Sequence, residues 1–347
     1  MLSVLIPTYD FVCYPLVAAL QAQGERLGLD YEILVADDGS RCAESVAANA
    51  AIEALPRCRF IRRERNAGRA AIRNFLAGEA RGEWLVFIDC DACVENAAFL
   101  ADYAAAAAEV PVVVGGLYHT PRMQGAADGS KKSADSSKKS ADSSKKSADS
   151  LKKSADSFSY SADRKDLPVD SRPLRECSLR LRYETEADRR RSAEERSRHP
   201  YRNFSTFNFM VRRDVFQSIR FDEGCCEYGY EDTLFGAELE RRGIALRHID
   251  NPLLHTGLDT NAQFLAKSEA ALRTLSRLYD RVGEYSRVGS AYRRVENCHL
   301  APLLRAGYRL AGPLLRRCLE RSAAPSLRLF ALYKLFYFAR VMGSRPQ

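Results

Sequence analysis

Short apolar runs alternate with amphipathic, helix-forming segments over the first 120 residues, and this alternation is the strongest constraint on the fold. Runs rich in Val, Ile and Leu are typical of buried strands, whereas the segments between them repeat their apolar residues with helical spacing. The expected strands are Leu2–Ile6, Tyr31–Ala36, Arg59–Arg62, Trp84–Ile88 and Val110–Gly115, and the expected helices are Leu16–Leu27, Ala43–Ala54, Ala70–Ala80 and Ala97–Ala108. Strands that alternate with helices favour an α/β fold with a mostly parallel sheet flanked by helices.

The length and composition are those of a large folded domain with an appendage. The 347 residues are 46% hydrophobic and 28% charged, as in an ordinary soluble protein. No stretch of about 20 residues lacks charge, so we expect no transmembrane helix. No secretory signal follows Met1, so the ten cysteines are expected to be reduced thiols. Cys90 and Cys93 have no second pair of matching spacing, which disfavours a zinc site.

A heptapeptide repeat occupies residues 129–165, after the alternating strands and helices. The sequence Lys-Lys-Ser-Ala-Asp-Ser begins at Lys131 and recurs at Lys138, Lys145 and Lys152. Coiled coils share the period of seven, but this repeat has almost no apolar residue to form a seam. Ser, Lys and Asp cannot bury enough apolar surface to offset the entropy of ordering. We expect a disordered, solvated insertion, and a phosphorylated or partner-binding segment is the alternative.

The positive charge is concentrated at the carboxyl-terminal end. Residues 301–347 carry eight Arg and one Lys against one Glu, a surplus equal to the net charge of +8 of the whole chain. This distribution disfavours nucleic-acid binding and favours an anionic membrane surface. Residues 326–340 predict a helix with a broad apolar face and a cationic remainder, which either lies in a membrane interface or packs on the core. Further helices are expected over 172–198, Leu234–Arg242 and Ala262–Leu278.

Acidic residues follow the second and fourth of the expected strands. Asp38 follows the second, and Asp89 and Asp91 follow the fourth with one residue between them. The carboxyl ends of parallel strands form the crevice where open α/β sheets bind ligands. Buried carboxylates require a compensating cation, and oxygen ligands suit Mg²⁺ or Mn²⁺, which also bind phosphates. The alternatives are a strand that merely ends in acids and, at Asp38, a turn with a helix cap.

Four further positions have side chains that suit the same chemistry. Arg69 and Arg73 share a face at the start of an expected helix, where cations and the helix amino terminus suit a diphosphate, although such Arg pairs are usually only solvated. Asp232 precedes another helix, as a cap or as a general base on an acceptor hydroxyl. His255 follows an apolar pair and is either structural or a metal ligand.

Taken in this order, these segments resemble the family 2 glycosyltransferases of the GT-A fold, over roughly residues 2–120 and 201–260. The motifs that carry the resemblance are Pro7-Thr8-Tyr9, Asp37-Asp38-Gly39-Ser40, Asn66-x-Gly68-Arg69-x-x-x-Arg73-Asn74, Asp89-x-Asp91 and Glu231-Asp232. The resemblance implies a Rossmann-like GT-A domain over residues 1–260, interrupted by the repeat. A helical, basic, amphipathic region over 261–347 lies outside it.

The resemblance also implies roles for individual residues. The nucleotide-sugar site would comprise Pro7, Thr8, Tyr9, Asp38, Arg69, Arg73 and Asp89, with Asp38 on the base. The metal, Mn²⁺ or Mg²⁺, would be held by Asp91 with Asp89 and His255. Asp232 would be the catalytic base, with Glu231 beside it. One departure is Asp10, since such loops often have Asn there.

We therefore expect a metal-dependent, inverting glycosyl transfer from a UDP-linked sugar to a glycan or lipid-linked acceptor in cell-surface polysaccharide synthesis. The expected location is the cytoplasm, with peripheral association at the cytoplasmic face of the inner membrane and no nucleic-acid partner. Two other classes stay open. A sugar nucleotidyltransferase usually has a Gly-rich loop where this chain has Pro7-Thr8-Tyr9, and a non-catalytic scaffold would use the repeat.

Overall fold

A computed structural model of the protein describes residues 1–119, 176–225 and 228–345. The heptapeptide repeat of residues 129–165, with its expected disorder, lies outside the described residues. The described parts on either side of the repeat belong to one compact unit.

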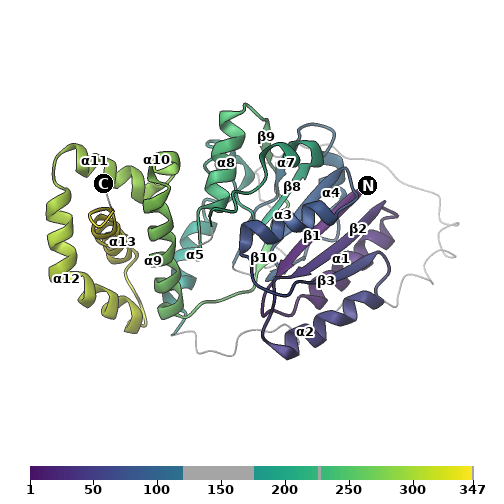
Figure 1. Ribbon diagram of the computed structural model, residues 1–347, viewed down its shortest axis with the longest axis horizontal. Helices are drawn as coiled ribbons and strands as arrows, with labels where there is room; N and C mark the ends of the chain where they lie inside the picture. Colours follow the sequence, from purple (N-terminus) through teal and green to yellow (C-terminus); the bar gives the residue numbers. More distant parts are fainter. Residues whose placement is uncertain (120–175, 226–227, 346–347) are drawn as a thin grey trace, which may run out of the picture. The chain divides into compact units, whose positions relative to one another are not determined.

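A seven-stranded sheet forms the centre of the amino-terminal region (Figure 1). Its strand order is β3-β2-β1-β4-β8-β6-β9. The strands are β1 (Leu2–Thr8), β2 (Tyr31–Asp37), β3 (Cys58–Arg62), β4 (Trp84–Ile88), β6 (Val112–Val114), β8 (Asn208–Arg212) and β9 (Leu246–His248). Pairing is parallel throughout except at β8, which runs antiparallel to both β4 and β6. The expected mostly parallel sheet is confirmed.

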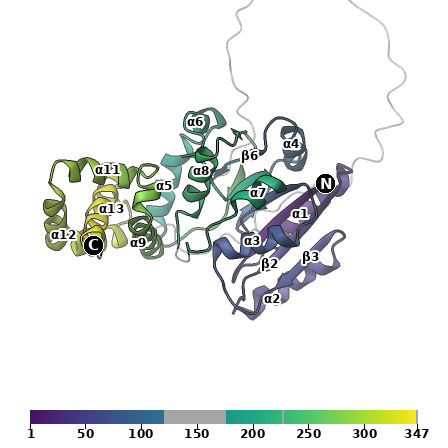
Figure 2. The same ribbon diagram turned by 45° about the horizontal axis from the view of Figure 1, so that its top comes forward.

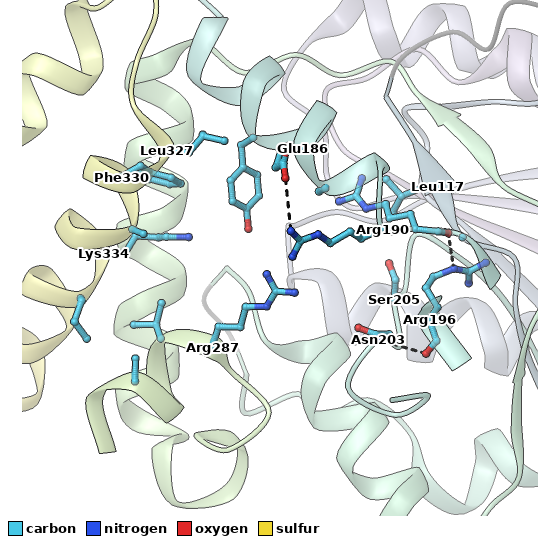
Figure 3. Close-up of a pocket in the computed structure, with 18 of the residues that line it drawn as sticks. Leu117, Glu186, Arg190, Arg196, Asn203, Ser205, Arg287, Leu327, Phe330 and Lys334 are labelled. Carbon is cyan, nitrogen blue, oxygen red and sulfur yellow. Dashed lines mark hydrogen bonds and ion pairs between the residues drawn. The ribbon is translucent and has the colours of Figure 1, made fainter. Parts of the chain in front are cut away.

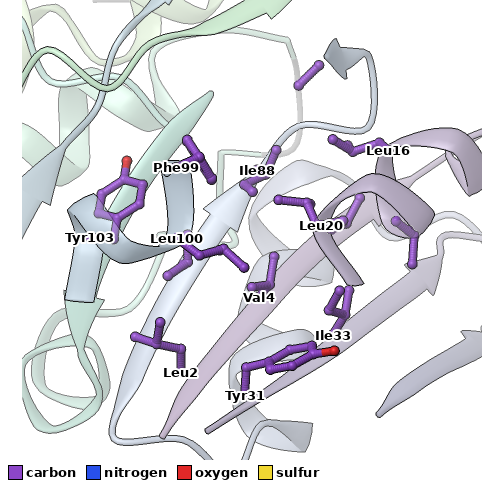
Figure 4. Close-up of a cluster of buried hydrophobic side chains, with 14 of the residues drawn as sticks. Leu2, Val4, Leu16, Leu20, Tyr31, Ile33, Ile88, Phe99, Leu100 and Tyr103 are labelled. Carbon is purple, nitrogen blue, oxygen red and sulfur yellow. The ribbon is translucent and has the colours of Figure 1, made fainter. Parts of the chain in front are cut away.

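Helices cover both faces of this sheet, because its central strands are apolar on both sides. One face packs on α1 (Tyr14–Arg26), α4 (Phe99–Ala106) and Ile52, which follows α2 (Ala43–Ala50). The other face packs on α3 (Arg69–Glu79), α7 (Arg213–Ile219) and α8 (Glu231–Arg241). Successive side chains of β1 point to opposite faces of the sheet. Val4 packs in one cluster with Leu20 and Phe99 (Figure 4), and Leu5 packs in the other with Leu76. The expected helix over Ala43–Ala54 ends as a 3₁₀ turn at Ala51–Ala54.

A second, small sheet lies beside the first and consists of β5 (Ala92–Cys93), β10 (Leu253–His255) and β7 (Leu117–Tyr118). His255 pairs with Ala92 across the antiparallel ladder between β10 and β5. This register places His255 next to Asp91, the residue before Ala92. The two side chains are 164 positions apart in the sequence numbering, and these short strands bring them together.

The carboxyl-terminal region is helical (Figure 2). It contains α9 (Asn261–Arg277), α10 (Tyr279–Val282), α11 (Arg287–Asn297), α12 (Ala301–Arg321) and α13 (Leu327–Met342), and the connector before β8 forms α5 (Ser178–Asp188) and α6 (Ala193–Ser197). The aromatic face of α13, with Phe330, Tyr333 and Phe338, is buried in a third core against Leu272 and Leu275 of α9. Of the two arrangements left open for this helix, packing on the core is therefore the one observed.

The most exposed apolar residues of this region lie on α12 instead. Leu303, Leu310 and Leu314 are 65%, 85% and 65% exposed. Within the described residues, no helix combines the length and the apolar character that a membrane crossing requires.

Candidate active site

The carboxyl ends of β1, β2 and β4 lie side by side, because the three strands are parallel neighbours. The register pairs Thr8 at the end of β1 with Asp37 at the end of β2. The loop after β4 carries Asp89 and Asp91 to the same edge. The sheet therefore brings together the motifs expected to bind a nucleotide and those expected to bind a metal, the latter at the metal-side end of the site.

Asp38 is buried and fully engaged within the protein. It is 3% exposed, and its carboxylate accepts hydrogen bonds from Arg63 Nη1 at 3.0 Å, Gly68 N at 2.9 Å and Ala67 N at 3.1 Å. These contacts hold the loop that leads into α3. The carboxylate of Asp38, which was expected to contact a nucleotide base, therefore stabilises the conformation of this loop.

Unlike Asp38, the neighbouring Asp37 keeps one carboxylate oxygen that accepts no hydrogen bond from the described residues. It is 1% exposed, and its Oδ1 accepts from the backbone N and the Oγ of Ser40 at 2.9 and 2.5 Å. Its Oδ2 is buried without a hydrogen-bond partner among the described residues, with Arg62 Nε 3.7 Å away. A buried carboxylate oxygen without a donor is costly unless a ligand supplies one. Asp37 is therefore a second candidate, beside Asp38, for the contact with a nucleotide base.

The loop after β1 adds an aromatic surface. Thr8 is buried and its Oγ1 donates to Phe11 O at 3.0 Å, while Tyr9 is 40% exposed and Pro7 is partly buried. Asp10 adopts a left-handed conformation with φ of 49°, and its Oδ1 accepts from the backbone N of Arg41 and Cys42. Asp10 thereby ties this loop to the one after β2, which accounts for an acid at that position.

Arg73 joins two of the acidic motifs. Its guanidinium is 2% exposed, lies 2.5 Å from Asp89 Oδ1 and 4.0 Å from Glu231 Oε1. Arg69, half exposed, pairs with the same Glu231 oxygen at 3.2 Å and lies over the ring of Tyr228. Burial acts to raise the pKa of Glu231, but the charges of Arg69 and Arg73 outweigh it and lower that pKa. Arg73 is therefore enclosed by the protein, and Arg69 is the cation that still faces solvent.

Asp91 and His255 form a pair at the metal-side end of the site. His255 Nε2 lies 3.1 Å from Asp91 Oδ2, and His255 Nδ1 is buried without a hydrogen-bond partner among the described residues. Burial acts to raise the pKa of Asp91, but the hydrogen bond and charge of His255 prevail and lower it. A Cβ at Gly257 would lie 2.9 Å from Asp91 Oδ2, so only glycine leaves this space open.

The donor set of this pair fits a divalent cation in part. A carboxylate oxygen and an imidazole nitrogen suit Mn²⁺, and substrate phosphates and water usually complete such sites. Asp89, the third expected ligand, is held by Arg73. In the part of the chain that the structure describes, no group of three or more His, Cys, Asp or Glu side chains is arranged to hold a metal alone.

Asp232 lies in the first turn of α8, after Tyr230 in a left-handed conformation with φ of 68°. Its Oδ1 accepts from Thr233 N at 2.6 Å, and its second oxygen has no protein donor in the described residues. Burial and the neighbouring charge of Glu231 raise the pKa of Asp232 to about 6. A carboxylate with a raised pKa is a stronger base than an ordinary Asp and is still ionised at neutral pH.

A polar network that the motifs did not reveal lies beside His255. The ring of His119 is 4.9 Å from the ring of His255, centroid to centroid. Asp188 of α5 accepts from the backbone N of His119 at 2.8 Å, and Arg191 pairs with Asp188 at 2.8 Å and with Glu184 at 2.8 Å. Only the alternation of acids and arginines around residues 184–191 was visible in the sequence, which is common on solvated helices.

Comparison with known proteins identifies the family of the chain. Residues 3–220 match the family model described as glycosyl transferase family 2. The chain belongs to this family, as its motifs predicted. An uncharacterized glycosyltransferase of Haemophilus influenzae is 30% identical over 93 residues, which cover 27% of this chain and 30% of that protein. The chain thus aligns with less than a third of the length of that relative.

Solved structures similar to this chain include two complexes. The mannosyltransferase PcManGT from Pyrobaculum calidifontis, in complex with GDP-Man and Mn²⁺, has a TM-score of 0.46 and 13% identity, over 95% of this chain and 85% of that one. TarS 1–349 of S. aureus, in complex with UDP, has a TM-score of 0.46 and 15% identity, over 99% of this chain and 90% of that one.

Proposed function

We propose that the protein transfers a sugar, with inversion, from a UDP-linked donor to an acceptor hydroxyl. The observation that carries this proposal is the meeting, at one sheet edge, of a free buried acceptor on Asp37 with the Asp91–His255 pair. The first suits the base of a nucleotide and the second suits its metal-bound diphosphate. Membership of glycosyl transferase family 2 supports the reaction type.

The donor would lie along the carboxyl ends of β1, β2 and β4. Asp37 Oδ2 would accept the imide N–H of uracil, in place of Asp38, and the exposed ring of Tyr9 would stack on the base. Asp89, held by Arg73, would contact the ribose. Asp91 and His255 would hold Mn²⁺ or Mg²⁺, which when bound neutralises charge on the departing diphosphate. Arg69 would add a second positive charge beside it.

Asp232 would act as the general base. The free carboxylate oxygen of Asp232 would accept the proton of the acceptor hydroxyl while the hydroxyl oxygen bonds to the anomeric carbon of the donor. The bond from the anomeric carbon to the diphosphate breaks on the opposite face, and the nucleoside diphosphate leaves with the bonding electrons. Glu231, whose pKa is lowered by its Arg partners, stays ionised and keeps the pKa of Asp232 raised.

The acceptor would be a glycan or lipid-linked molecule of cell-surface polysaccharide synthesis, reached at the cytoplasmic face of a membrane. The surplus of Arg over residues 301–347 and the exposed leucines of α12 support this location. We further propose residues 1–260 as the transferase domain and 261–347 as the region that brings it to the membrane.

A nucleotide-release assay tests the proposal. The full chain is incubated with UDP-, GDP- and dTDP-sugars, Mn²⁺ and a membrane extract as the source of acceptor, and the free nucleoside diphosphate is measured. We expect release of UDP, and a fall in kcat of about 10²–10⁴-fold for Asp232→Asn with donor binding retained. Equal turnover by Asp232→Asn would remove Asp232 from the mechanism. Formation of UTP and sugar 1-phosphate from a UDP-sugar and added inorganic diphosphate, without release of UDP, would indicate a nucleotidyltransferase.

A further inference from the structure

A cavity of about 830 Å³ lies between the amino-terminal sheet and the carboxyl-terminal helices (Figure 3). Side chains of α5, α11 and α13 form most of its wall, and Gly116 and Leu117 close it on the side of the sheet. Its volume is within the range of about 300–1,000 Å³ typical of small-molecule sites and far exceeds that of a single phosphate ion. None of the residues expected to bind the donor lines it.

The polar part of the wall is cationic. Arg190, Arg287 and Lys334 line the cavity, and Glu186 is the one carboxylate among its described lining residues. Glu186 pairs with Arg190 at 3.8 Å, but neither Arg287 nor Lys334 has a carboxylate within 4.0 Å in the described parts of the chain. Figure 3 shows Arg190 and Arg287 extending into the same space. Cations left without counterions in a concave site favour an anionic ligand.

The rest of the wall is apolar. Leu327, Phe330, Leu332 and Leu335 of α13 line one side, and Val288 of α11 continues it. Lys334 projects from the same helix, with its ammonium 4.4 Å from the centre of the Phe330 ring. The ligand that fits both surfaces therefore has an anionic group joined to a hydrocarbon chain.

One arginine connects the cavity to the candidate active site. Arg191 lines the cavity, and its Nη1 lies 2.9 Å from Nδ1 of His119. The ring of His119 is in turn 4.9 Å from the ring of His255, which pairs with Asp91. The path from the cavity to the Asp91–His255 pair thus runs through the side chains of Arg191 and His119.

We propose that this cavity binds the lipid phosphate part of the acceptor, with the phosphate or diphosphate against Arg190, Arg287 and Lys334 and the hydrocarbon chain against the leucines of α13. The inference rests on the proposed glycosyl transfer and names its acceptor class as a lipid-linked phosphate. An anionic membrane lipid has the same phosphate group, and the experiment below distinguishes the lipid-linked acceptor from such a lipid.

Calorimetric titration of the full chain in metal-free buffer tests the proposal, with farnesyl diphosphate as the probe. We expect saturable binding, at least about tenfold weaker binding of farnesol and of inorganic diphosphate, and no competition by UDP. Equal binding of either fragment would overturn the proposal, as would displacement of the probe by UDP. Displacement by phosphatidylglycerol vesicles would assign the cavity to bulk lipid and contradict its role for the acceptor.

Matched substitutions locate the binding. Arg287→Gln and Lys334→Gln are each expected to weaken farnesyl diphosphate about tenfold, whereas Arg294→Gln of α11 and Arg328→Gln of α13, which lie outside the cavity lining, should not. Leu332→Glu should abolish binding, and Leu329→Glu, at similar exposure on the same helix, should preserve it. All six sites are partly or fully exposed, so the thermal midpoint should not change. Equal effects of the paired variants would refute the assignment.

Failure of this inference is distinguishable from failure of the proposed function. Probe binding is measured without donor or metal, and nucleotide release is measured separately. A chain that releases UDP from a UDP-sugar but binds no farnesyl diphosphate keeps its transferase role and loses the lipid phosphate site.

Discussion

At the scale of single residues, the partners of each carboxylate decide what it can do. Asp38, Asp89 and Glu231 accept from arginines or backbone N–H groups of the protein itself. Asp37 and Asp232 each keep one oxygen without a protein donor in the described residues. We therefore propose that Asp38 and Glu231 shape the site, that Asp89 is oriented by Arg73, and that Asp37 and Asp232 each present an oxygen to a substrate.

The raised pKa of Asp232 predicts an acid limb in the pH profile. A general base must be ionised, so kcat/KM should rise tenfold per pH unit below about 6 and level off above it. The measurement is initial UDP release between pH 4.5 and 8.5. A profile that is flat between pH 5 and 7 would contradict the assignment.

The same shift has a consequence for stability. Since the pKa of Asp232 in the folded state lies above that of an unfolded Asp, ionising it costs stability as the pH rises through about 6. Asp232→Asn should therefore raise the thermal midpoint at pH 8, with a gain that shrinks toward pH 4. This readout also shows that the variant is folded. A lower midpoint at pH 8 would mean that the charge of Asp232 is stabilised by contacts other than those described.

Substitution of Asp37 should weaken UDP binding, whereas substitution of Asp38 should lower the thermal midpoint. Asp37→Asn replaces the free acceptor by a donor, so we expect UDP to bind about tenfold more weakly with little change in the thermal midpoint. Asp38→Asn loses acceptors for Arg63 and Gly68 and should lower the midpoint. Titration with UDP and thermal unfolding of both variants check this. A loss of UDP affinity confined to Asp38→Asn would restore the role first expected for Asp38.

At the scale of elements, the antiparallel strand β8 carries a buried polar residue that joins several segments. Asn208 is fully buried, accepts from Tyr103 Oη at 2.6 Å and donates to Gly116 O at 2.9 Å and Asn251 O at 2.8 Å. These bonds connect β8, α4 and the loops that lead to β7 and β10. The position of His255 relative to Asp91 therefore depends on Asn208.

Asn208→Leu should lower the free energy of unfolding by about 3 kcal/mol, because it removes a partner from three buried polar groups, of which Gly116 O keeps a second donor in the backbone N of Leu253. Tyr103→Phe, which removes only the Tyr103 hydroxyl, should cost about 1–2 kcal/mol. Urea unfolding of the two variants gives the comparison. Similar losses for both would show that the two carbonyls find other donors.

The sequence predicted long elements well and short ones poorly. Strands such as Trp84–Ile88 and helices such as the one observed over Arg69–Glu79 have enough residues for a period to be visible. The two- and three-residue strands β5, β7 and β10 have no period, although they bring His255 to Asp91. Adjacent residues on a strand point to opposite faces, so the motif Asp37-Asp38 did not tell which carboxylate faces the ligand.

At the scale of the whole molecule, the basic carboxyl-terminal region contributes both buried core residues on α13 and exposed leucines on α12. Phe330 and Tyr333 of α13 are buried in the third core, so truncation at residue 300 would disturb packing as well as surface. The exposed leucines of α12 can be changed without touching that core. They are therefore the direct way to test the proposed contact with a membrane.

Replacement of Leu303, Leu310 and Leu314 by Glu should abolish sedimentation with phosphatidylglycerol liposomes, because it removes apolar surface and reverses local charge. Val12→Glu, exposed to 42% in the amino-terminal region, should sediment like the unmodified chain. Liposomes of neutral phosphatidylcholine should bind the unmodified chain more weakly. Undiminished sedimentation of the triple variant would refute α12 as the membrane contact.

Asp91 and His255 are proposed to hold a divalent cation that binds the diphosphate of a nucleotide sugar. Calorimetric titration of UDP with and without Mn²⁺ tests this role, with the unmodified chain and Asp91→Asn compared side by side. We expect Mn²⁺ to tighten UDP binding at least about tenfold for the unmodified chain and to have no such effect for Asp91→Asn. UDP binding of equal affinity with and without Mn²⁺, or an undiminished effect of Mn²⁺ on Asp91→Asn, would contradict it.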